Sequence, residues 1–364
     1  MNAPQMPHMP HIGVLPSGAL GTIADVSGVT VGHCTLDQGP IQTGVTVIRA
    51  HRDDPYLQKV PAAASVINGF GKSIGLVQLE ELGVLETPIA LTSTFGVAAV
   101  AQAQIRAAIA SNPQIGREWP TVNPLVFECN DGYLNDIQAL AIHETHYAQA
   151  LDAAAAAFAR GSVGAGRGMS CFDLKGGIGS SSRVVSVSGR DFTVGALVLA
   201  NFGRLPMLTI DGVPVGRELA PARPTQAAHE TVSKPEQGSI IMIVATDAPL
   251  DARQLKRLSM RAAAGLARTG SVYGHGSGDI ALAFSTAWTV AHEGDFIATP
   301  PLFNDVRLDP LFHACADSVE QAIVDALWSA TSVTGRDGHT RLSLHDAAPD
   351  LQQRLKQRLT QRSA

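Results

Sequence analysis

A serine stands at the start of a short apolar run in the second half of the chain, where a hydroxyl could act as a nucleophile. The run is Ser239-Ile240-Ile241-Met242-Ile243-Val244-Ala245-Thr246, and Gly238 precedes it. Its length and its β-branched residues predict a buried strand that begins at Ser239. A serine in this position is more often a plain turn residue. The case for chemistry therefore depends on which other polar residues the fold brings to it.

A second group of polar residues follows one predicted helix later. Residues 250–270 carry apolar side chains at three- and four-residue spacing, which predicts an amphipathic helix. The next segment is Tyr273-Gly274-His275-Gly276-Ser277-Gly278-Asp279, and it leads into a second apolar strand. A strand–helix–strand unit of this length returns its second strand beside the first. We therefore expect Ser277 and Asp279 to lie near Ser239 at one end of a sheet.

Other short motifs recur in a fixed order along the chain. They are Gly21-Thr22-Ile23-Ala24-Asp25-Val26, Gln42-Thr43-Gly44-Val45-Thr46, Ile67-Asn68-Gly69-Phe70-Gly71-Lys72, Asn130-Asp131-Gly132-Tyr133-Leu134-Asn135-Asp136, Lys175-Gly176-Gly177-Ile178-Gly179 and Asn201-Phe202-Gly203. With Gly238-Ser239-Ile240-Ile241 and the segment around Ser277, this combination resembles the self-processing aminopeptidases of the L-aminopeptidase/D-amidase-esterase and β-aminopeptidase family. The tails, at about residues 1–15 and 340–364, add nothing to the likeness.

The resemblance implies a fold and a reaction. The fold is a four-layer α/β/β/α sandwich of the N-terminal-nucleophile kind, formed as one domain by residues 1–364. The implied reaction removes an N-terminal residue from a small peptide, amide or ester. The family cuts its own chain before the nucleophile, which here gives an α chain of residues 1–238 and a β chain of residues 239–364. It also implies a homo-oligomer of cut αβ protomers.

By the same resemblance, Ser239 attacks the carbonyl of Gly238 and becomes a new N-terminus. Its α-amine has an ordinary pKa of about 8, so a useful fraction is neutral and can accept the proton of the hydroxyl. In this scheme Asp279 orients Ser277, and Ser277 hydrogen-bonds Ser239. The family also shows Glu where this chain has Asp279. Asp keeps the negative charge, but its shorter side chain places the carboxylate closer to the backbone.

Three more residues receive roles from the resemblance alone. Asn201 would donate to the oxyanion of the tetrahedral intermediate, as a neutral fixed donor does well. Tyr133 would form a wall of the active site and hydrogen-bond the reacting carbonyl. Glu128 would bind the ammonium group of the substrate. From sequence pattern alone, Asn201 is an ordinary turn residue and Tyr133 an ordinary hairpin anchor.

Three alternatives stay open. A Ser-His-Asp relay through His275 and Asp279 is disfavoured, because Ser277 lacks the Gly-x-Ser-x-Gly elbow and His275 is only two residues from it. An acyltransferase on the same kind of fold would pass the acyl group to an amine, but such enzymes use Thr where this chain has Ser239. The third alternative is an uncleaved, non-catalytic relative that kept the scaffold.

Composition excludes several classes of partner. The formal net charge of −5 leaves no basic surface for nucleic acid. No apolar run approaches the length of a bilayer span, and residues 1–10 lack the parts of a signal peptide. The four cysteines are dispersed, which favours reduced thiols in the cytoplasm over a disulfide framework. We expect a soluble, cytoplasmic protein with no nucleic-acid and no membrane partner.

No motif for a metal or a cofactor is complete. The segment Gly69-Phe70-Gly71-Lys72 lacks the first glycine of a phosphate loop, because Val66 stands in its place. The pair His33-Cys34 offers too few ligands for zinc, which needs three or four. We therefore expect neither a cofactor nor a metal.

Local patterns predict the surrounding elements. Short β-branched runs in residues 22–46 predict antiparallel strands, and residues 184–200 predict a hairpin. Residues 137–160 are rich in Ala and predict a long helix or two helices. Residues 161–183 are dense in Gly and Ser and predict a loop. Residues 221–238 are polar, carry prolines and predict a linker that can move once it is cut at its end.

Overall fold

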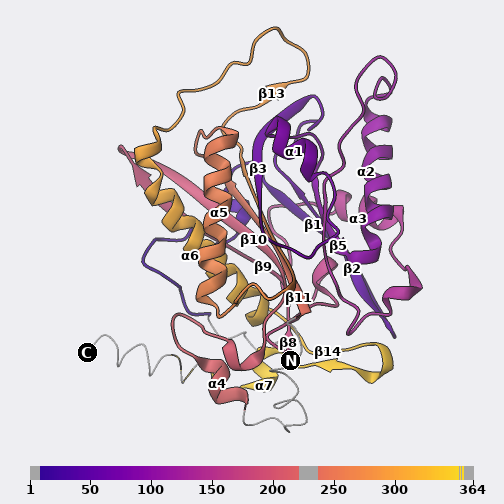
Figure 1. Cartoon of the computed structure of the whole chain (residues 1–364), viewed down its shortest axis with the longest axis vertical. Coiled ribbons are helices and arrows are strands. Elements are labelled where there is room, and N and C mark those ends of the chain that lie inside the picture. Colours follow the sequence, from indigo (N-terminus) through magenta and orange to yellow (C-terminus); the bar gives the residue numbers. More distant parts are fainter. Residues whose placement is uncertain (1–8, 221–236, 352, 354, 356–364) are drawn as a thin grey trace.

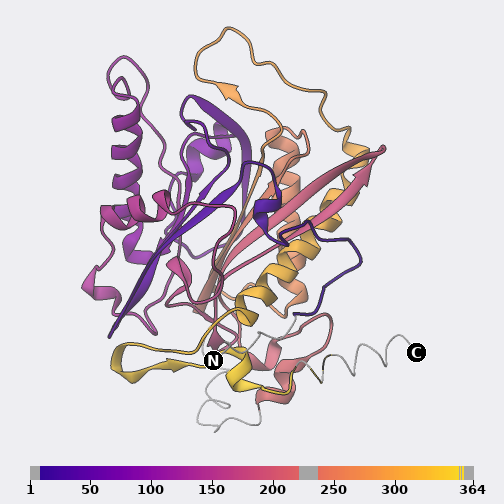
Figure 2. The same cartoon turned by 180° about the vertical axis from the view of Figure 1, so that it is seen from behind.

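Two β-sheets lie face to face in the middle of the molecule, and helices cover the outer face of each (Figures 1 and 2). The structure is a computed structural model that describes residues 9–220, 237–351, 353 and 355. Helices α2 (Val97–Ser111) and α3 (Glu144–Asp152) form one outer layer, and helices α5 (Ala252–Arg268) and α6 (Asp309–Trp328) form the other. The four-layer α/β/β/α sandwich is thereby confirmed.

The first sheet has the strand order β1-β2-β5-β6. Its strands are β1 (Thr30–Gln38), β2 (Ile41–Arg49), β5 (Ile89–Ser93) and β6 (Val126–Cys129). β1 and β2 pair antiparallel, which confirms the prediction for this part of the chain, whereas β5 and β6 run parallel. Helix α3 packs on β1 and β2, and α2 packs on β5 and β6.

The second sheet has the strand order β13-β3-β12-β11-β10-β9, with β4 beside β3. Its strands are β3 (Gln58–Gly69), β4 (Val84–Leu85), β9 (Gly177–Val187), β10 (Arg190–Asn201), β11 (Gln237–Thr246), β12 (Gly276–Ser285) and β13 (Val290–Ala291). β11 and β12 lie parallel with α5 between them in the sequence, so the predicted strand–helix–strand unit is confirmed. Helix α5 packs on β3 and β12, and α6 packs on β9 and β10.

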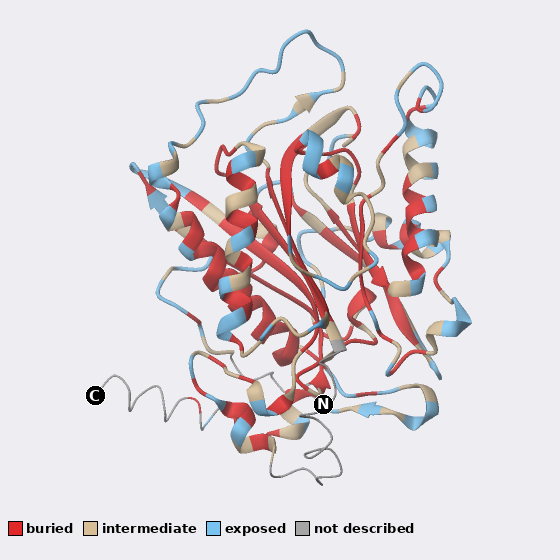
Figure 3. Ribbon diagram, viewed as in Figure 1, coloured by how far each residue is buried: buried red, intermediate tan, exposed pale blue. Residues whose placement is uncertain are grey.

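Strand β11 is buried on both faces, as Figure 3 shows for most of the second sheet. Ile241 and Ile243 belong to the core between the two sheets, whereas Ile240, Met242 and Val244 belong to the core under α5 and α6. Successive side chains of a strand point to opposite faces, so a strand with an apolar layer on each side reads as one continuous apolar run. Each such side chain contributes about 1.5–3 kcal/mol of burial free energy. The strand begins at Gln237, two residues before the predicted start, and its burial on both faces fixes the position of Ser239 near this end.

Smaller elements connect the layers. They are α1 (Leu76–Leu82), α4 (Val215–Leu219), α7 (Leu344–Ala347), the ribbon of β7 (Ser170–Cys171) with β8 (Leu174–Lys175), and the ribbon of β14 (Val333–Thr334) with β15 (Thr340–Arg341). The four cysteines are buried thiols. In the described part of the chain, none of the helices combines the length and the apolar character that crossing a membrane requires. Most of the predicted linker, residues 221–236, lies outside the described residues.

Of the long helix or two helices predicted over residues 137–160, the single long helix is wrong, and the two helical segments that form end at Asp152. The structure has one short helical turn at Ile137–Ala139 and then α3, which ends at Asp152. Beyond α3 the chain runs beside β1, where the backbone groups of Ala155 and Val31 exchange two hydrogen bonds of 3.0 and 3.1 Å. Alanine has a high helix propensity, but that preference is weak enough for strand contacts to override it.

The predicted loop over residues 161–183 is wrong from Gly177 onward, where β9 begins. Gly179 lies where α6 crosses β9, and a Cβ there would collide with the backbone of Ala322 and Ala326. The serines that follow are buried and bonded. The Ser180 hydroxyl donates to Ala196 O at 2.7 Å, and the Ser181 hydroxyl donates to Ser318 O at 2.6 Å. Glycine and serine here permit close packing of a helix on a strand rather than a turn.

Replacing Gly179 by alanine should destabilise the fold. The new methyl group would push α6 away from β9, and such overpacking costs about 1–3 kcal/mol. The free energy of unfolding, measured by denaturant titration, checks this. Ser186→Ala is the matched control on the exposed end of the same strand, and it should change the free energy by less than about 0.5 kcal/mol. Equal values for the two variants would contradict the close packing.

Candidate active site

Three adjacent strands bring the predicted residues to one end of the second sheet. Ser239 on β11 lies opposite Asn201, the last residue of β10. On the other side, Ser239 lies opposite Gly278 of β12. Ser277 and Asp279 flank Gly278, so the register itself brings them beside the serine. The expectation that these residues share one sheet end is confirmed.

The Ser239 hydroxyl lies against the peptide bond that precedes it. Its Oγ is 2.5 Å from the carbonyl oxygen of Gly238, and it accepts a hydrogen bond of 3.3 Å from the backbone N–H of Gly278. Ser239 is only 4% exposed. The buried hydroxyl therefore donates a hydrogen bond to the carbonyl oxygen of the peptide group that precedes it.

Two glycines make this arrangement possible through close backbone contacts. A Cβ on Gly238 would lie 2.8 Å from both Asn201 O and Phe202 Cα. A Cβ on Gly278 would lie 2.8 Å from Phe70 O. Neither position can carry a side chain without displacing main chain on the neighbouring segment. The close approach of the end of β10 to Gly238 thus explains why a glycine precedes Ser239.

Ser277 and Asp279 form a buried pair on β12. The Ser277 hydroxyl donates to Asp279 Oδ1 at 2.5 Å, so the shorter carboxylate of Asp still reaches the serine. Both side chains are at most 1% exposed. Burial, and secondarily the Asp279 charge, raises the pKa of Tyr273. The hydrogen bond from Ser277 to Ser239 stays a prediction.

The side-chain amide of Asn201 is held at both of its ends. Its Oδ1 accepts from the backbone N–H of Ser170 at 2.8 Å, and its Nδ2 donates to Asn130 O at 3.0 Å. These partners settle which end is oxygen and which is nitrogen. An amide nitrogen carries two hydrogens, so Nδ2 keeps a second hydrogen for another acceptor.

Tyr133 follows Asn130 on the same turn and is 40% exposed. Its ring is stacked on that of His339 at a centroid distance of 4.7 Å. The guanidinium carbon of Arg341 lies 3.8 Å from the Tyr133 ring centroid. A partly exposed phenol with its ring fixed by two neighbours fits the predicted wall of a site.

Glu128, on β6 of the first sheet, is 3% exposed. Its Oε1 accepts from the backbone N–H of Lys72 at 2.8 Å, and its Oε2 accepts from the Thr94 hydroxyl. Gly71 lies between it and β12, because a Cβ on Gly71 would be 3.6 Å from Glu128 Oε1 and 3.8 Å from Gly278 Cα. The structure therefore brings Glu128 of one sheet close to the end of the other sheet that carries Ser239 and Gly278.

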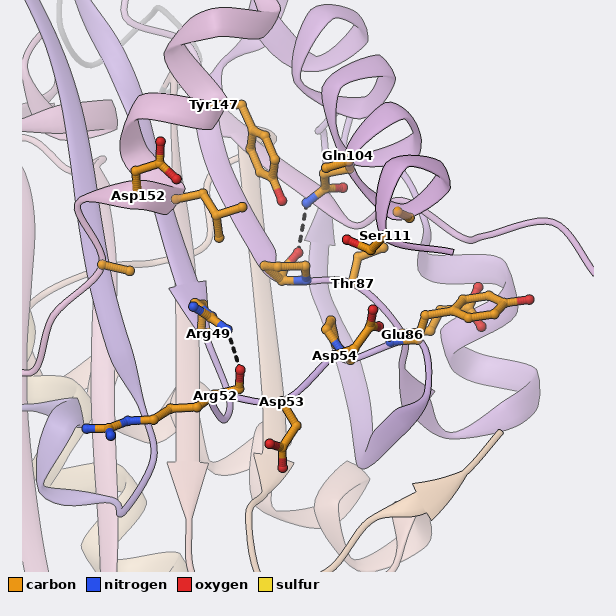
Figure 4. A pocket seen from close by; sticks show the side chains of 17 residues that line it. Arg49, Arg52, Asp53, Asp54, Glu86, Thr87, Gln104, Ser111, Tyr147 and Asp152 are labelled. Carbon is orange, nitrogen blue, oxygen red and sulfur yellow. Dashed lines mark hydrogen bonds between the residues drawn. The ribbon is translucent and has the colours of Figure 1, made fainter. Parts of the chain in front are cut away.

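A separate cavity of about 450 Å³ lies at the opposite end of the first sheet (Figure 4). Arg49, Asp54, Gln104 and Tyr147 are among its lining residues. Several of its polar groups are already bonded within the chain. Arg49 donates to Arg52 O, Asp54 accepts from Asn112, and the Gln104 amide donates to Pro88 O. This cavity contains none of the predicted site residues. In the described residues, no cluster of His, Cys, Asp or Glu could hold a metal ion.

Comparison with known proteins decides the family. Residues 21–341 match the model of Peptidase family S58. The chain belongs to this family. It is 40% identical over 344 residues to a β-peptidyl aminopeptidase, BapA, of Sphingosinicella microcystinivorans, across 89% of this chain and 85% of that protein. The resemblance drawn from the motifs is confirmed, and the chain is a peptidase.

Two solved structures share the fold over almost the whole chain. The PH0078 protein of Pyrococcus horikoshii OT3 is 45% identical with a TM-score of 0.88, and the match covers 95% of this chain and 97% of that one. The L-aminopeptidase D-Ala-esterase/amidase of Ochrobactrum anthropi is 34% identical with a TM-score of 0.85, covering 94% and 96%. That protein is described as a variant of the Ntn hydrolase fold.

Two residues of this S58 peptidase, Lys175 and Asp131, hold the site together but had no predicted role. Lys175 is fully buried, and its ammonium group donates to the carbonyl oxygens of Gly166, Met169 and Gly176 at 2.8–3.0 Å. Burial lowers its pKa well below the ordinary value. Lys175 thereby folds the loop that presents Ser170 to Asn201. The motif around Lys175 was visible in the sequence, but no spacing rule linked Ser170 to this role.

Asp131 supports the turn that carries Tyr133. It is 1% exposed, and its Oδ1 accepts from the Asn135 amide at 3.1 Å. Burial raises the pKa of Asp131 to about 6. The folded chain therefore binds this proton more tightly than the unfolded chain does. The resulting stability is present below about pH 4 and is lost as the pH rises to about 6.

Replacing Asp131 by asparagine should remove this pH dependence. The variant keeps an oxygen for Asn135 and buries no charge, so its gain over the wild type should grow between pH 4 and pH 6, to about 1–3 kcal/mol. Denaturant unfolding at several pH values measures it. Asp37→Asn, which alters an exposed carboxylate, is the control and should stay within about 0.5 kcal/mol at every pH. A gain that does not vary with pH would show that Asp131 is charged or neutral throughout.

Proposed function

We propose that this S58 peptidase cuts its own chain between Gly238 and Ser239 and then acts as an aminopeptidase on small peptides, amides or esters. The observation that carries the proposal is the Ser239 hydroxyl, 2.5 Å from the carbonyl oxygen of Gly238 at a buried strand end. We further propose that the cut protomers assemble as a cytoplasmic homo-oligomer, with no nucleic-acid or membrane partner.

Self-cleavage needs one nucleophile and one water. Ser239 Oγ attacks the Gly238 carbonyl carbon, and the peptide nitrogen leaves as the amine of Ser239, so the amide becomes an ester. Water then hydrolyses this ester. The products are a carboxylate on Gly238 and a free α-amine and hydroxyl on Ser239. The close approach of Asn201 and Phe202 to Gly238 supports the step, because it holds the scissile peptide in place.

Turnover then uses the new N-terminus. The α-amine of Ser239 takes the proton of the hydroxyl, Oγ attacks the substrate carbonyl, and the amine returns the proton to the leaving group. The acyl group stays on Ser239 until water releases it. Asn201 has a spare amide hydrogen for the oxyanion, and Tyr133 supplies a second donor. Ser277, bonded to Asp279, supports the nucleophile from the neighbouring strand.

Glu128 gives the reaction its preference for a free N-terminus. Among the described residues, each carboxylate oxygen accepts one donor, from Lys72 and Thr94 respectively, which leaves acceptor capacity on both oxygens for a substrate ammonium. Buried carboxylates need such partners, because an unpaired buried charge is costly. The names of the relatives, a β-peptidyl aminopeptidase and an L-aminopeptidase D-Ala-esterase/amidase, support aminoacyl substrates.

Ser239→Ala should abolish both cleavage and hydrolysis. Without the hydroxyl there is no attack on Gly238, so the variant should stay full length, folded and inactive. Denaturing mass spectrometry should find two fragments in the wild type, residues 1–238 and 239–364, and a single chain in the variant. Circular dichroism checks the fold.

Ser186→Ala, on the exposed end of β9, serves as the control and should cut as the wild type does. Activity that survives in Ser239→Ala would sink the assignment. Release of free acid in the presence of an added amino acid separates hydrolysis from acyl transfer, because a transferase would form a new amide instead.

Glu128→Gln should weaken binding of substrates that carry a free amine. A hydrogen bond to a charged group contributes about 1.5–3 kcal/mol, so kcat/KM for an aminoacyl p-nitroanilide should fall by about 10–100-fold, mainly through KM. Self-cleavage should persist. Glu80→Gln, an exposed residue paired with Lys256, should change kcat/KM less than about twofold. If the N-acetylated substrate were cleaved as fast as the free amine, Glu128 would not be the ammonium site.

A further inference from the structure

Both groups proposed to stabilise the oxyanion are connected to one side chain, that of Arg341. The guanidinium covers the Tyr133 ring at 3.8 Å, and its Nε donates to the Ser170 hydroxyl at 3.1 Å. The Arg341 side chain is 21% exposed, so most of it is shielded from water. One arginine therefore contacts the tyrosine directly and reaches the asparagine through a serine.

These contacts close into a ring. Ser170 receives the Arg341 Nε–H on its hydroxyl and gives its own backbone N–H to Asn201 Oδ1. The other end of the Asn201 amide donates to Asn130 O at 3.0 Å. Asn130 begins the turn that carries Tyr133, and Tyr133 lies under Arg341 again. A closed ring restrains each member more than separate contacts do, since moving one member strains the others.

The ribbon of β14 and β15 also contacts the turn that carries Tyr133. His339 stacks on the Tyr133 ring, and its Nδ1 donates to Tyr133 O at 2.9 Å. Arg336 Nε donates to Gly132 O at 2.7 Å. These contacts come from a segment that lies more than 200 residues after the turn in the sequence.

We propose that Arg341 is a positioning residue that fixes Tyr133 and Asn201 together in the geometry for oxyanion stabilisation. The inference rests on the proposed function. It adds that the fragment after the cut supplies more than the nucleophile: residues 239–364 also align two donors that belong to residues 1–238.

Arginine suits this position for a geometric reason. Its planar guanidinium lies on an aromatic face while an N–H at its edge donates in the plane. A lysine keeps a cation near the ring but has no planar group to make both contacts at once. Arg341→Lys should therefore keep part of the effect, and Arg341→Met should lose it.

The kinetic test compares Arg341→Met, Arg341→Lys and Thr340→Ala on an aminoacyl p-nitroanilide. Thr340 lies beside Arg341 in β15, and in the described part of the chain its hydroxyl bonds to Thr334 across the ribbon and to Gly338 O in the turn, so it is the matched control. Complete loss of one oxyanion donor lowers kcat by about 10²–10³. Arg341→Met keeps both donors and only weakens their alignment, so kcat should fall by a smaller factor of about 10–100. KM should change less than about twofold. The lysine variant should fall between wild type and methionine, and Thr340→Ala should match the wild type.

Coupling to the donors separates positioning from a merely structural role. In the Tyr133→Phe background, Arg341→Met should lower kcat by a smaller factor than it does in the wild type. Factors that simply multiply would overturn the proposal, and so would an Arg341→Met enzyme with wild-type kcat. If the methionine variant does not fold, the lysine variant decides in the same way.

A structural test of the role of Arg341 does not require an active enzyme. Crystal structures of Ser239→Ala with and without Arg341→Met should differ in the Tyr133 ring and the Asn201 amide, while Ser277 and Asp279 stay in place. Unmoved Tyr133 and Asn201 would overturn the proposal. An uncut and inactive wild type would instead refute the proposed function, and these crystals would still decide the role of Arg341.

Discussion

Close backbone approach at the head of β11 is the constraint on which the site depends. Gly238 lets the end of β10 come within contact distance, and Gly278 does the same for the segment at Phe70. With those contacts made, the strand register alone places Asn201 and Ser277 within one residue of Ser239. A side chain at either glycine would displace main chain rather than a flexible group. Backbone packing therefore sets the relative positions of these residues, independently of the hydrogen bonds that their side chains make.

Polar groups around the serine are held by the main chain, and this limits their freedom. The Asn201 amide lies between two backbone partners, Glu128 accepts from the Lys72 N–H, and Lys175 donates to three carbonyls. Burying these groups has a cost that their hydrogen bonds offset, and burial shifts the pKa of Lys175. The gain is preorganisation, because groups already in place need little rearrangement when charge develops.

The sandwich brings together segments that are remote in sequence. Glu128 belongs to the first sheet and Ser239 to the second, and only the face-to-face packing of the sheets brings them near each other. The ribbon of β14 and β15 adds a third source of contacts, since it reaches back to the turn at Tyr133. A chain cut at Gly238 would still be held by these contacts, because both fragments contribute strands to the same sheet.

The amino-acid pattern alone determined the order of the main elements, the parallel pair around α5 and the gathering of Ser239, Ser277 and Asp279 at one sheet end, because apolar periodicity and ordered motifs are local signals. It failed where tertiary contacts override local preference. Residues 153–160 leave the helix to run beside β1, and Gly179 belongs to a strand because α6 packs on it. The pairing of Arg341 with Tyr133 and Ser170 has no local signature either. Such contacts join residues far apart in sequence, and their identity depends on which surfaces the fold apposes, which only the tertiary structure decides.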